Sequence, residues 1–310
     1  PPPLPSRSPA VPWEQFSLPG VARRLGADVV FSPANFGPIF ARKHVVLLRN
    51  STSVIRLTRR LKPLVYWLLL SAATVASLVM ARRAIAVSNY AARVLTFGLR
   101  GVLCKKGSIV YHGTQPPPTP PTDASRTGNM LLAVSDIYIQ KNYHTLVRAF
   151  ARVRERYPNL VLTIVGREIN DQYAESVREI VRELNIGHAV TFTGHVGTAE
   201  LDALYRDCRV FVFPSTVETF GNPLLEAMAA GAPIATSKTA AMPEVVGDAG
   251  LLFDPENAID IAARIEQLLD DPDLCSELGR KAAIRAQSFT WAETARRTLD
   301  VLREAAGRKV

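Results

Sequence analysis

The chain has 310 residues, more than one domain usually needs and enough for two, and its 47% hydrophobic content is that of a folded globular protein. Three scattered cysteines, Cys104, Cys208 and Cys275, argue against a disulfide framework or a Cys/His metal site and indicate buried thiols in a reducing compartment. Residues 1–125 hold 16 Lys and Arg against 3 Asp and Glu, a net charge of +13, whereas residues 126–310 hold 21 against 25, a net charge of −4.

The basic first part suits anionic lipid head groups, phosphorylated substrates or nucleic acid as partners. No aromatic residues alternate with the basic ones in the manner of a single-strand or RNA-binding surface, which argues against nucleic acid. The opening "PPPLPSRSPAVP" has neither an initiator Met nor a signal-peptide pattern, so it resembles a flexible arm or the cut edge of a longer chain. Four strand-like runs follow, "ADVVF", "HVVLLR", "AIAVS" and "SIVY", and predict a small α/β domain.

A long apolar run separates the second and third of these strands. It is uncharged from Leu64 to Met80, over 17 residues, which is short of the roughly 20 that a membrane-spanning helix needs. Ser71, Thr74 and Ser77 recur at helical spacing and form a narrow polar stripe that lipid would disfavour. Two predictions remain open: a buried domain helix, or a helix lying in the membrane interface, since "RLTRRLK" supplies four basic residues just before it.

A proline-rich stretch, "GTQPPPTPPTDASRTGN", is typical of an interdomain linker. After it, the strand-like runs "MLLAV", "LVLTIV", "AVTFT", "RVFVF" and "PIAT" alternate with helical periodicity, which predicts a parallel sheet covered on both faces. The apolar stripes of the first two helices indicate core: Leu146, Val147, Phe150 and Val153, then Tyr173, Val177, Ile180, Val181 and Leu184.

A capping-box pattern, Thr290 and Glu293, starts a separate final helix. The expected domains are residues 1–122, 123–288 and, for the final helix, 289–310.

One loop and helix of the second part combine features of a ligand site. The buried strand "RVFVF" is followed by the loop "PSTVETFG" and the helix "NPLLEAMAAG", with Asn222 as the expected N-cap, Pro223 at the first helical position and Gly231 as the terminator. Ligands bind at the carboxyl ends of parallel strands. Unpaired amides of Gly221, Asn222 and Leu224, with the helix dipole behind them, therefore predict a phosphate or diphosphate site.

Two carboxylates flank this helix start, Glu218 in the loop and Glu226 one turn inside the helix. An acid beside a diphosphate is a like-charge cost, so its presence favours sugar hydroxyls as the groups that are held, and Glu226 could bridge two vicinal hydroxyls. The structural alternative is that Glu226 only complements the helix dipole and that Glu218 is a solvated loop acid.

The stretch "PSTVETFGNPLLEAMAAGAPIATSKTAAMPEVVGDAGLLFDP" resembles the donor-binding segment of retaining glycosyltransferases of family 4, with its motif of Glu, seven residues and Glu. "KNYHTLVRAF", "VTFTGHV" and "FTWAETA" fit that family in the same order, so the similarity covers roughly residues 84 to 306. The resemblance implies the α/β GT-B fold: two Rossmann-like domains with parallel sheets, the second binding a nucleotide-sugar and the final helix crossing back to the first.

The resemblance also implies residue roles. Glu218 would hold the transferred sugar. The backbone at Phe220, Gly221 and Asn222 would contact the hydroxyls of that sugar or the phosphates. Glu226 would bind the ribose hydroxyls. Lys141, in "IQKN", stands where the family places a lysine on the donor diphosphate, and a cation there stabilises the leaving group.

The chain departs from the family pattern in three places. The family usually has Gly-Arg where this chain has Ser135 and Asp136, so one diphosphate cation is missing or replaced. Arg167 in "VGRE" is a candidate substitute, and the alternative is an ordinary surface arginine. A His usually ends a central strand of the first domain, where "LLRNS" puts Arg49 and Asn50. Several strand and helix units that the family has before "ADVVF" are lacking, which predicts an incomplete or truncated first domain.

The prediction is a retaining, metal-independent glycosyltransferase that needs no cofactor. It would move a sugar from a UDP-, GDP- or ADP-sugar to a glycan or lipid-linked acceptor, in the cytoplasm or peripherally at the inner membrane surface. The single Asp-x-Asp, Asp271 to Asp273, is interpreted as a turn and not as a metal site. The alternative is a non-catalytic nucleotide-sugar-binding or assembly subunit. A nicotinamide-dependent dehydrogenase is disfavoured, because no G-x-G-x-x-G follows a strand.

Overall fold

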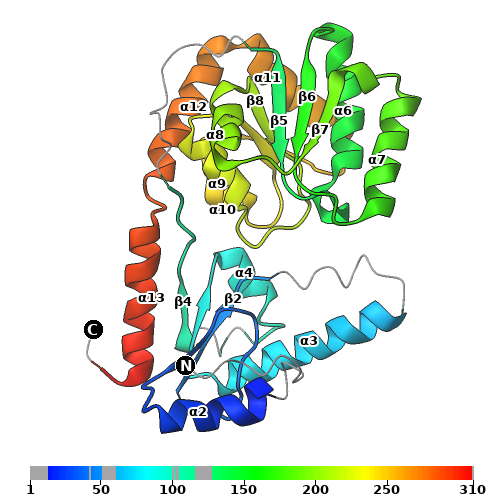
Figure 1. Ribbon diagram of the computed structural model, residues 1–310. Helices are drawn as coiled ribbons and strands as arrows, with labels where there is room; N and C mark the ends of the chain where they lie inside the picture. Colours follow the sequence, from blue (N-terminus) through cyan, green and yellow to red (C-terminus); the bar gives the residue numbers. More distant parts are fainter. Residues whose placement is uncertain are drawn as a thin grey trace. The chain divides into compact units, whose positions relative to one another are not determined.

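The computed structural model describes residues 13–41, 43–50, 61–99, 101, 105–115 and 128–308. The chain divides into two compact units: unit 1 consists of residues 1–111 and 292–310, and unit 2 of residues 112–291. Each unit is built around one sheet whose strands are all parallel, as the α/β expectation requires (Figure 1).

Unit 1 has a four-stranded sheet in the order β1-β2-β3-β4. Its strands overlap the four runs predicted from the sequence, with shifts of a residue or more at their ends: β1 (Val30–Ser32), β2 (His44–Leu48), β3 (Arg83–Ala86) and β4 (Gly107–Ile109). The helices are η1 (Trp13–Ser17), α2 (Leu18–Arg24), α3 (Leu61–Met80), α4 (Asn89–Val94) and, from Ala292 onward, α13 (Trp291–Ala306). Apolar side chains of the sheet and of α13 share one core cluster, which contains Val45, Ile85, Val110, Val301 and Ala305.

Helix α3 turns its polar stripe inward. Thr74 and Ser77 are buried, and the Ser77 hydroxyl accepts a hydrogen bond from the Gly37 amide at 3.1 Å. Leu68 and Leu69 are 55% and 67% exposed, so these two outward side chains of the helix are apolar. None of the described helices is both long and apolar enough to span a membrane. Most of the basic segment expected before α3 lies in residues 51–60, outside the described residues.

Unit 2 has a six-stranded sheet in the order β10-β9-β8-β5-β6-β7. The strands are β5 (Met130–Val134), β6 (Val161–Val165), β7 (Val190–Gly194), β8 (Val210–Phe213), β9 (Ile234–Ser237) and β10 (Leu251–Phe253). Five of them were predicted; β10 was not, because three residues are too short a run to show alternation. Strands β6 and β7 follow outward on one side of β5, and β8, β9 and β10 follow outward on the other side. The strand order therefore reverses between β5 and β8, at the place where doubly wound sheets bind ligands.

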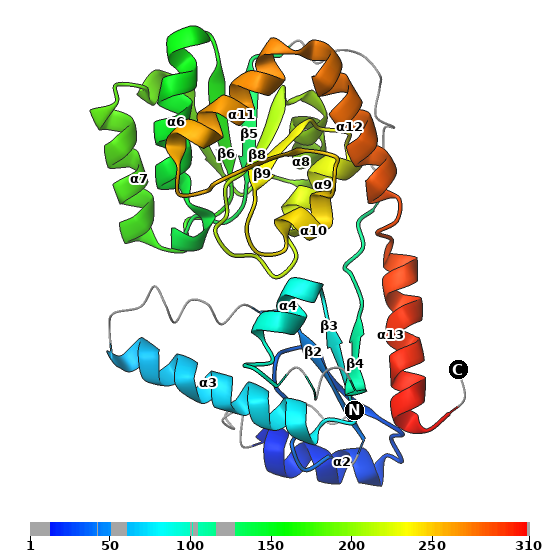
Figure 2. The same ribbon diagram turned by 180° about the vertical axis from the view of Figure 1, so that it is seen from behind.

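Helices cover both faces of this sheet (Figures 1 and 2). Helix α6 packs against α7 and α11, and α9 packs against α8, α10 and α12. The predicted core stripe of α6 is fully buried, whereas Leu184, at the end of α7, is 39% exposed and does not belong to the core. The bounds are η3 (Ile139–Lys141), α6 (Tyr143–Arg156), α7 (Asp171–Glu183), η4 (Gly187–Ala189), α8 (Thr198–Asp207), α9 (Asn222–Ala229), α10 (Met242–Val246), α11 (Ala258–Asp270) and α12 (Pro272–Ala286).

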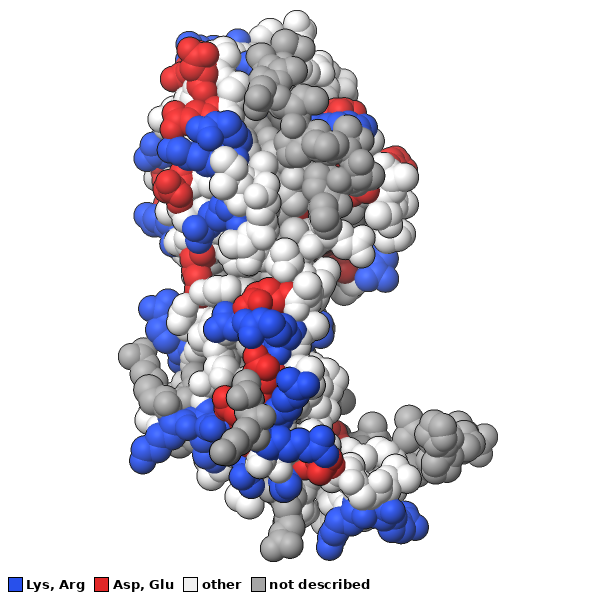
Figure 3. Space-filling view, turned by 90° about the vertical axis from the view of Figure 1, so that its left-hand side faces the viewer, with Lys and Arg blue, Asp and Glu red and all other residues white. Residues whose placement is uncertain are grey.

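Charge differs between the units, as the sequence indicates. On the face drawn in Figure 3, the elements of unit 1 carry several Lys and Arg with few acids between them, whereas basic and acidic side chains alternate over unit 2. Isolated ion pairs on such a surface contribute little to stability.

Candidate functional site

The loops after β5 and β8 are joined by hydrogen bonds at the point where the strand order reverses. The Thr216 amide donates to the Gln140 carbonyl oxygen at 2.9 Å, and the Asn142 side chain donates to the Pro214 carbonyl oxygen at 3.2 Å. Asn142 has a φ of 58°, in the left-handed region that Asn tolerates better than most residues, and it forms the junction between η3 and α6. This junction directs the preceding residue, Lys141, toward the loop after β8.

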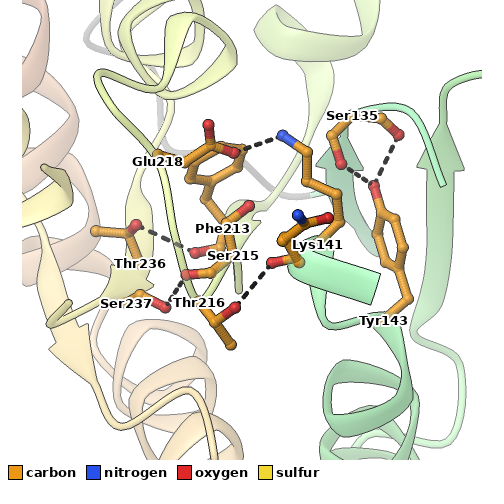
Figure 4. A network of polar contacts seen from close by, with 10 residues as sticks. Ser135, Lys141, Tyr143, Phe213, Ser215, Thr216, Glu218, Thr236 and Ser237 are labelled. Carbon is orange, nitrogen blue, oxygen red and sulfur yellow. Dashed lines mark hydrogen bonds and ion pairs between the residues drawn. The ribbon is translucent and has the colours of Figure 1, made fainter. Parts of the chain in front are cut away.

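Lys141 and Glu218 form a largely buried ion pair. The Lys141 Nζ lies 2.5 Å from the Glu218 Oε1, and the two side chains are only 9% and 17% exposed. Figure 4 shows the lysine reaching from η3 toward the carboxylate. The structure thus brings together the two residues expected to act on the donor, although 77 positions separate them in the sequence. A buried charge needs such a partner, because an isolated one would carry a large desolvation penalty.

The surroundings of Lys141 keep its ammonium charged. Burial by itself lowers the pKa of Lys141, but the negative charge of Glu218 and the neighbouring Tyr138 outweigh that effect, so the pKa is raised. The ammonium also lies 5.3 Å from the centre of the Tyr138 ring and 5.7 Å from that of Phe213, within the range of cation–π attraction. The site therefore holds a permanent cation.

The backbone that carries Glu218 is held from the side of β9. The Ser237 hydroxyl donates to the Ser215 carbonyl oxygen at 2.7 Å (Figure 4). The Thr239 hydroxyl donates to the Thr216 carbonyl oxygen at 2.9 Å. The Ala241 amide donates to the Glu218 carbonyl oxygen at 3.3 Å. A loop fixed at several points orders its carboxylate before any ligand arrives.

Helix α9 begins differently from the expectation. Its first residue is Asn222, and the N-cap is Gly221, with a φ of 93° that favours glycine. The Leu224 amide donates to the Gly221 carbonyl oxygen at 3.1 Å, which corrects the prediction that this amide is free. The amides of Gly221 and Asn222 have no acceptor within the described part of the chain, so two donors remain for an anion at this helix end.

Aromatic side chains pack at the start of α9. Phe220 is buried, and its ring centre lies 5.1 Å from that of His112 and 6.0 Å from that of Phe289. The His112 Nδ1 lies 2.8 Å from the Asn222 Oδ1, so the side chain expected to cap the helix is instead engaged with the segment that enters unit 2. The Phe220 ring thereby supports the backbone of residues 220–222.

Glu226 and Asn222 line a pocket of about 710 Å³ that lies entirely within unit 2. The Tyr205 hydroxyl donates to the Glu226 Oε2 at 2.9 Å. Burial raises the pKa of Glu226, the hydrogen bond from Tyr205 lowers it and the charge of Asp202 raises it, with a net increase. The other lining residues are Gly113, Thr114, Gln115, Thr198, Leu201, Asp202, Tyr205, Arg206, Ala229, Ala230 and Trp291.

Arg167 lies at the exposed edge of the site. Its side chain is 66% exposed and lies 3.3 Å from the Asp136 carboxylate, and its amide also donates to that carboxylate at 3.1 Å. The Arg167 side chain thus lies beside Asp136, at the position where the family has its second diphosphate cation, but it is paired with that acid. The neighbouring Ser135 turns its hydroxyl inward, 2.6 Å from the Tyr143 hydroxyl.

The remaining sequence-based candidates have structural partners. The amides of Arg49 and Asn50, after β2 in unit 1, both donate to the Asn35 side-chain oxygen at 2.9 Å. Asp271 caps α12 by accepting from the Leu274 amide at 2.9 Å, so the Asp-x-Asp marks a helix start. Within the described ranges, no group of three or more His, Cys, Asp or Glu could hold a metal ion. Cys208 and Cys275 are buried thiols outside any disulfide, and Cys104 lies outside the described residues.

Sequence reasoning missed Tyr205 and Asn142. Asn142 follows Lys141 in the sequence, and Tyr205 contacts Glu226 in the structure. The contacts of both residues depend on the order of strands in the sheet, which the periodicity of the sequence does not encode. For Tyr205 there was a weak signal: a tyrosine on the core side of a helix needs a partner for its hydroxyl.

Comparison with known proteins shows which family the sequence of unit 2 matches. Residues 120–285 match the family model described as glycosyl transferases group 1. The chain is 37% identical over 184 residues to a D-inositol 3-phosphate glycosyltransferase of Pseudarthrobacter chlorophenolicus, covering 58% of this chain and 44% of that protein. It is 34% identical over 165 residues to the O-antigen chain mannosyltransferase B of Escherichia coli, covering 52% and 42%. The chain therefore spans less than half the length of these relatives.

Solved structures share the fold. Anabaena Alr3699/HepE in complex with UDP-glucose superposes with a TM-score of 0.77 at 19% identity, covering 93% of this chain and 81% of that one. Sucrose-phosphate synthase from Thermosynechococcus elongatus gives a TM-score of 0.73 at 22% identity, covering 93% and 76%. Together with the family match over more than half of its length, this places the chain in the glycosyl transferases group 1 family, with the parallel-sheet architecture of GT-B enzymes.

Proposed function

We propose that this protein is a retaining glycosyltransferase that moves a sugar from a nucleotide diphosphate donor to a glycan or lipid-linked acceptor without a divalent metal. The observation that carries the proposal is the buried Lys141–Glu218 pair at the strand-order reversal. Glu218 comes shortly before Gly221 and Asn222, whose two amides are available at the start of α9. These groups match the parts of a nucleotide-sugar. The cation and the free amides suit the diphosphate, and the carboxylate can accept hydrogen bonds from sugar hydroxyls.

Each residue then has a defined task. Lys141 and the amides of Gly221 and Asn222 meet the diphosphate, and the lysine stabilises the charge that develops on the leaving group. Glu218 accepts hydrogen bonds from the transferred sugar, and Glu226 accepts them from the ribose. The leaving phosphate assists the incoming hydroxyl on the same face of the sugar, so the protein mainly orients groups and stabilises charge.

The names of similar proteins support a choice of first substrates. Alr3699/HepE is described in complex with UDP and with UDP-glucose, and curated relatives include mannosyltransferases and a glycogen synthase. UDP-glucose is therefore the first donor to test, followed by GDP- and ADP-sugars. The donor part comprises residues 123–288, the acceptor side residues 1–122, and residues 289–310 return to the acceptor side.

The experiment is a screen of these donors by thermal shift and by turnover, with Lys141→Ala and Glu226→Ala as variants. We expect at least a tenfold loss of donor affinity in each, since each substitution removes an interaction with a charged group. Arg156→Ala, which removes an exposed ion pair in unit 2, is the matched control and should bind like the unmodified protein. Unchanged donor affinity in both site variants would remove the proposal.

A non-catalytic nucleotide-sugar-binding or assembly subunit is the second candidate. It is favoured by the pairing of Arg167 with Asp136, because this arginine is the candidate substitute for the missing diphosphate cation and is already engaged with an acid. Donor binding without transfer to any acceptor, and without hydrolysis, would support this candidate. Turnover that depends on Lys141 would exclude it.

Peripheral contact with an anionic membrane forms part of the proposal. It is supported by the two outward apolar side chains of α3, Leu68 and Leu69, and by the basic charge of the first 125 residues. Vesicles that contain phosphatidylglycerol should carry the protein upward in a flotation gradient at low salt. Leu68→Asn with Leu69→Asn should reduce the floated fraction severalfold. Equal flotation on neutral vesicles would contradict an electrostatic contribution.

A further inference from the structure

Tyr205 stands behind the acid that lines the unit 2 pocket. It belongs to α8 and is 2% exposed, and its ring packs edge-on against Phe211 with the ring centres 5.6 Å apart. Its hydroxyl donates to the Glu226 Oε2 at 2.9 Å. Within the part of the chain that the structure describes, this is the one hydrogen bond made by the Glu226 side chain. One carboxylate oxygen is thus engaged by the protein, and the other is left for a ligand.

The hydrogen bond has two physical effects on the carboxylate. First, it fixes the rotation of the carboxyl group, because the donor comes from a packed ring on another helix and cannot follow a moving acceptor. Second, it favours the ionised form, which accepts hydrogen bonds but donates none, against the opposing effects of burial and of Asp202. A ligand with two adjacent hydroxyls benefits from both effects, because it needs a Glu226 carboxylate that is ionised and that is held in a fixed orientation.

We propose that Tyr205 is a positioning residue for the donor nucleotide, holding the Glu226 carboxylate so that it accepts hydrogen bonds from the vicinal hydroxyls of the ribose. This inference rests on the proposed function, since it assumes that Glu226 meets the ribose. Tyr205 also borders the pocket, but it is only 2% exposed and its hydroxyl is engaged with Glu226, so we assign its role to the hold on that carboxylate. Its contribution is therefore specific to nucleotides that carry both ribose hydroxyls.

The test is Tyr205→Phe, which keeps the ring and removes only the hydroxyl. Affinity for UDP, GDP and ADP is measured by calorimetry, and the nucleotide that binds best is compared with its 2′,3′-dideoxy form. We expect Tyr205→Phe to weaken the ribonucleotide roughly tenfold, the usual effect of losing a hydrogen bond to a charged group, and to leave the dideoxy form unchanged. With a turned-over donor, KM should rise by the same factor while kcat stays within twofold.

A matched control separates positioning from packing. Tyr173 is a buried tyrosine of α7 in the same unit, whose hydroxyl accepts a hydrogen bond from the His144 amide at 3.4 Å. Tyr173→Phe should leave nucleotide affinity unchanged. In a Glu226→Ala background, Tyr205→Phe should have no further effect, because the group that it positions is absent.

The outcomes distinguish the two proposals. If Glu226→Ala and Lys141→Ala both bind the nucleotide as well as the unmodified protein, the proposed function of the site is wrong. If only Glu226→Ala does so, Glu226 does not meet the ribose and the positioning role of Tyr205 is overturned. If Glu226→Ala weakens binding but Tyr205→Phe behaves like Tyr173→Phe, only the positioning role is overturned. Equal losses for the ribo and dideoxy forms in Tyr205→Phe would also overturn it, since the tyrosine would then act through general packing.

Discussion

At the scale of single residues, the centre of the site is an ion pair that neutralises itself. Lys141 and Glu218 are the most shielded pair of opposite charges at the site, and each is the partner that makes burial of the other tolerable. A donor diphosphate must therefore compete with Glu218 for the ammonium. Without a ligand, each of the two side chains holds the other in place. The same two side chains also present the positive and the negative charge that a donor would meet.

Removal of either member alone should destabilise unit 2. We expect Lys141→Met and Glu218→Gln each to lower the free energy of unfolding by about 3 kcal/mol, because the partner remains buried without a counter-charge. The double variant should recover much of this loss while remaining inactive. Urea unfolding of the four proteins measures it. Additive losses in the double variant would mean that the two side chains do not stabilise each other.

At the scale of elements, the start of α9 depends on a glycine in the left-handed region. A Cβ on Gly221 would lie 3.3 Å from the Phe213 Cε1, so Gly221→Ala combines backbone strain with crowding. We expect a loss of roughly 1–3 kcal/mol in unfolding free energy, together with weaker nucleotide binding. Gly194 also has a positive φ, but no atom lies within 4 Å of its Cβ position, so Gly194→Ala reports the strain alone. A smaller loss in Gly221→Ala than in Gly194→Ala would contradict this account.

Elements were more predictable from the sequence than contacts between them. Strands buried on both faces appear as continuous apolar runs, which is why β5, β6, β8 and β9 were predicted from the residues alone. The meeting of Lys141 with Glu218 depends instead on β8 pairing with β5, and no local pattern encodes strand order. The cap of α9 was misassigned because Gly221 and Asn222 are both acceptable caps, and only the backbone angles distinguish them.

At the scale of the whole molecule, unit 1 should be sensitive to acid. His44 is 1% exposed, its Nε2 lies 3.1 Å from the Ser32 hydroxyl, and burial lowers its pKa from 6.5 to about 4. Between these values the unfolded chain binds a proton that the folded chain excludes. Stability from this group is therefore complete above pH 6.5 and falls by about 1.4 kcal/mol for each pH unit below it, down to about pH 4.

Urea unfolding across this pH range, followed by tryptophan fluorescence, measures the effect. Trp13 and Trp67 report on unit 1 in a Trp291→Phe background. His44→Gln keeps a side chain that can hydrogen-bond to Ser32 but cannot titrate, so it should abolish this pH dependence. An unchanged slope in His44→Gln would assign the acid sensitivity to other groups.

The composition of unit 1 from two separated stretches has a consequence for biosynthesis. Helix α13 contributes Val301 and Ala305 to the core of the first sheet, yet the ribosome makes it only after all of unit 2. The nascent β1–β4 sheet must wait, with part of its apolar surface uncovered, while residues 112–291 are translated and can already fold as one continuous segment. Chaperones that recognise exposed apolar strands should therefore associate with the nascent chain mainly through its first sheet, and release it once α13 has emerged.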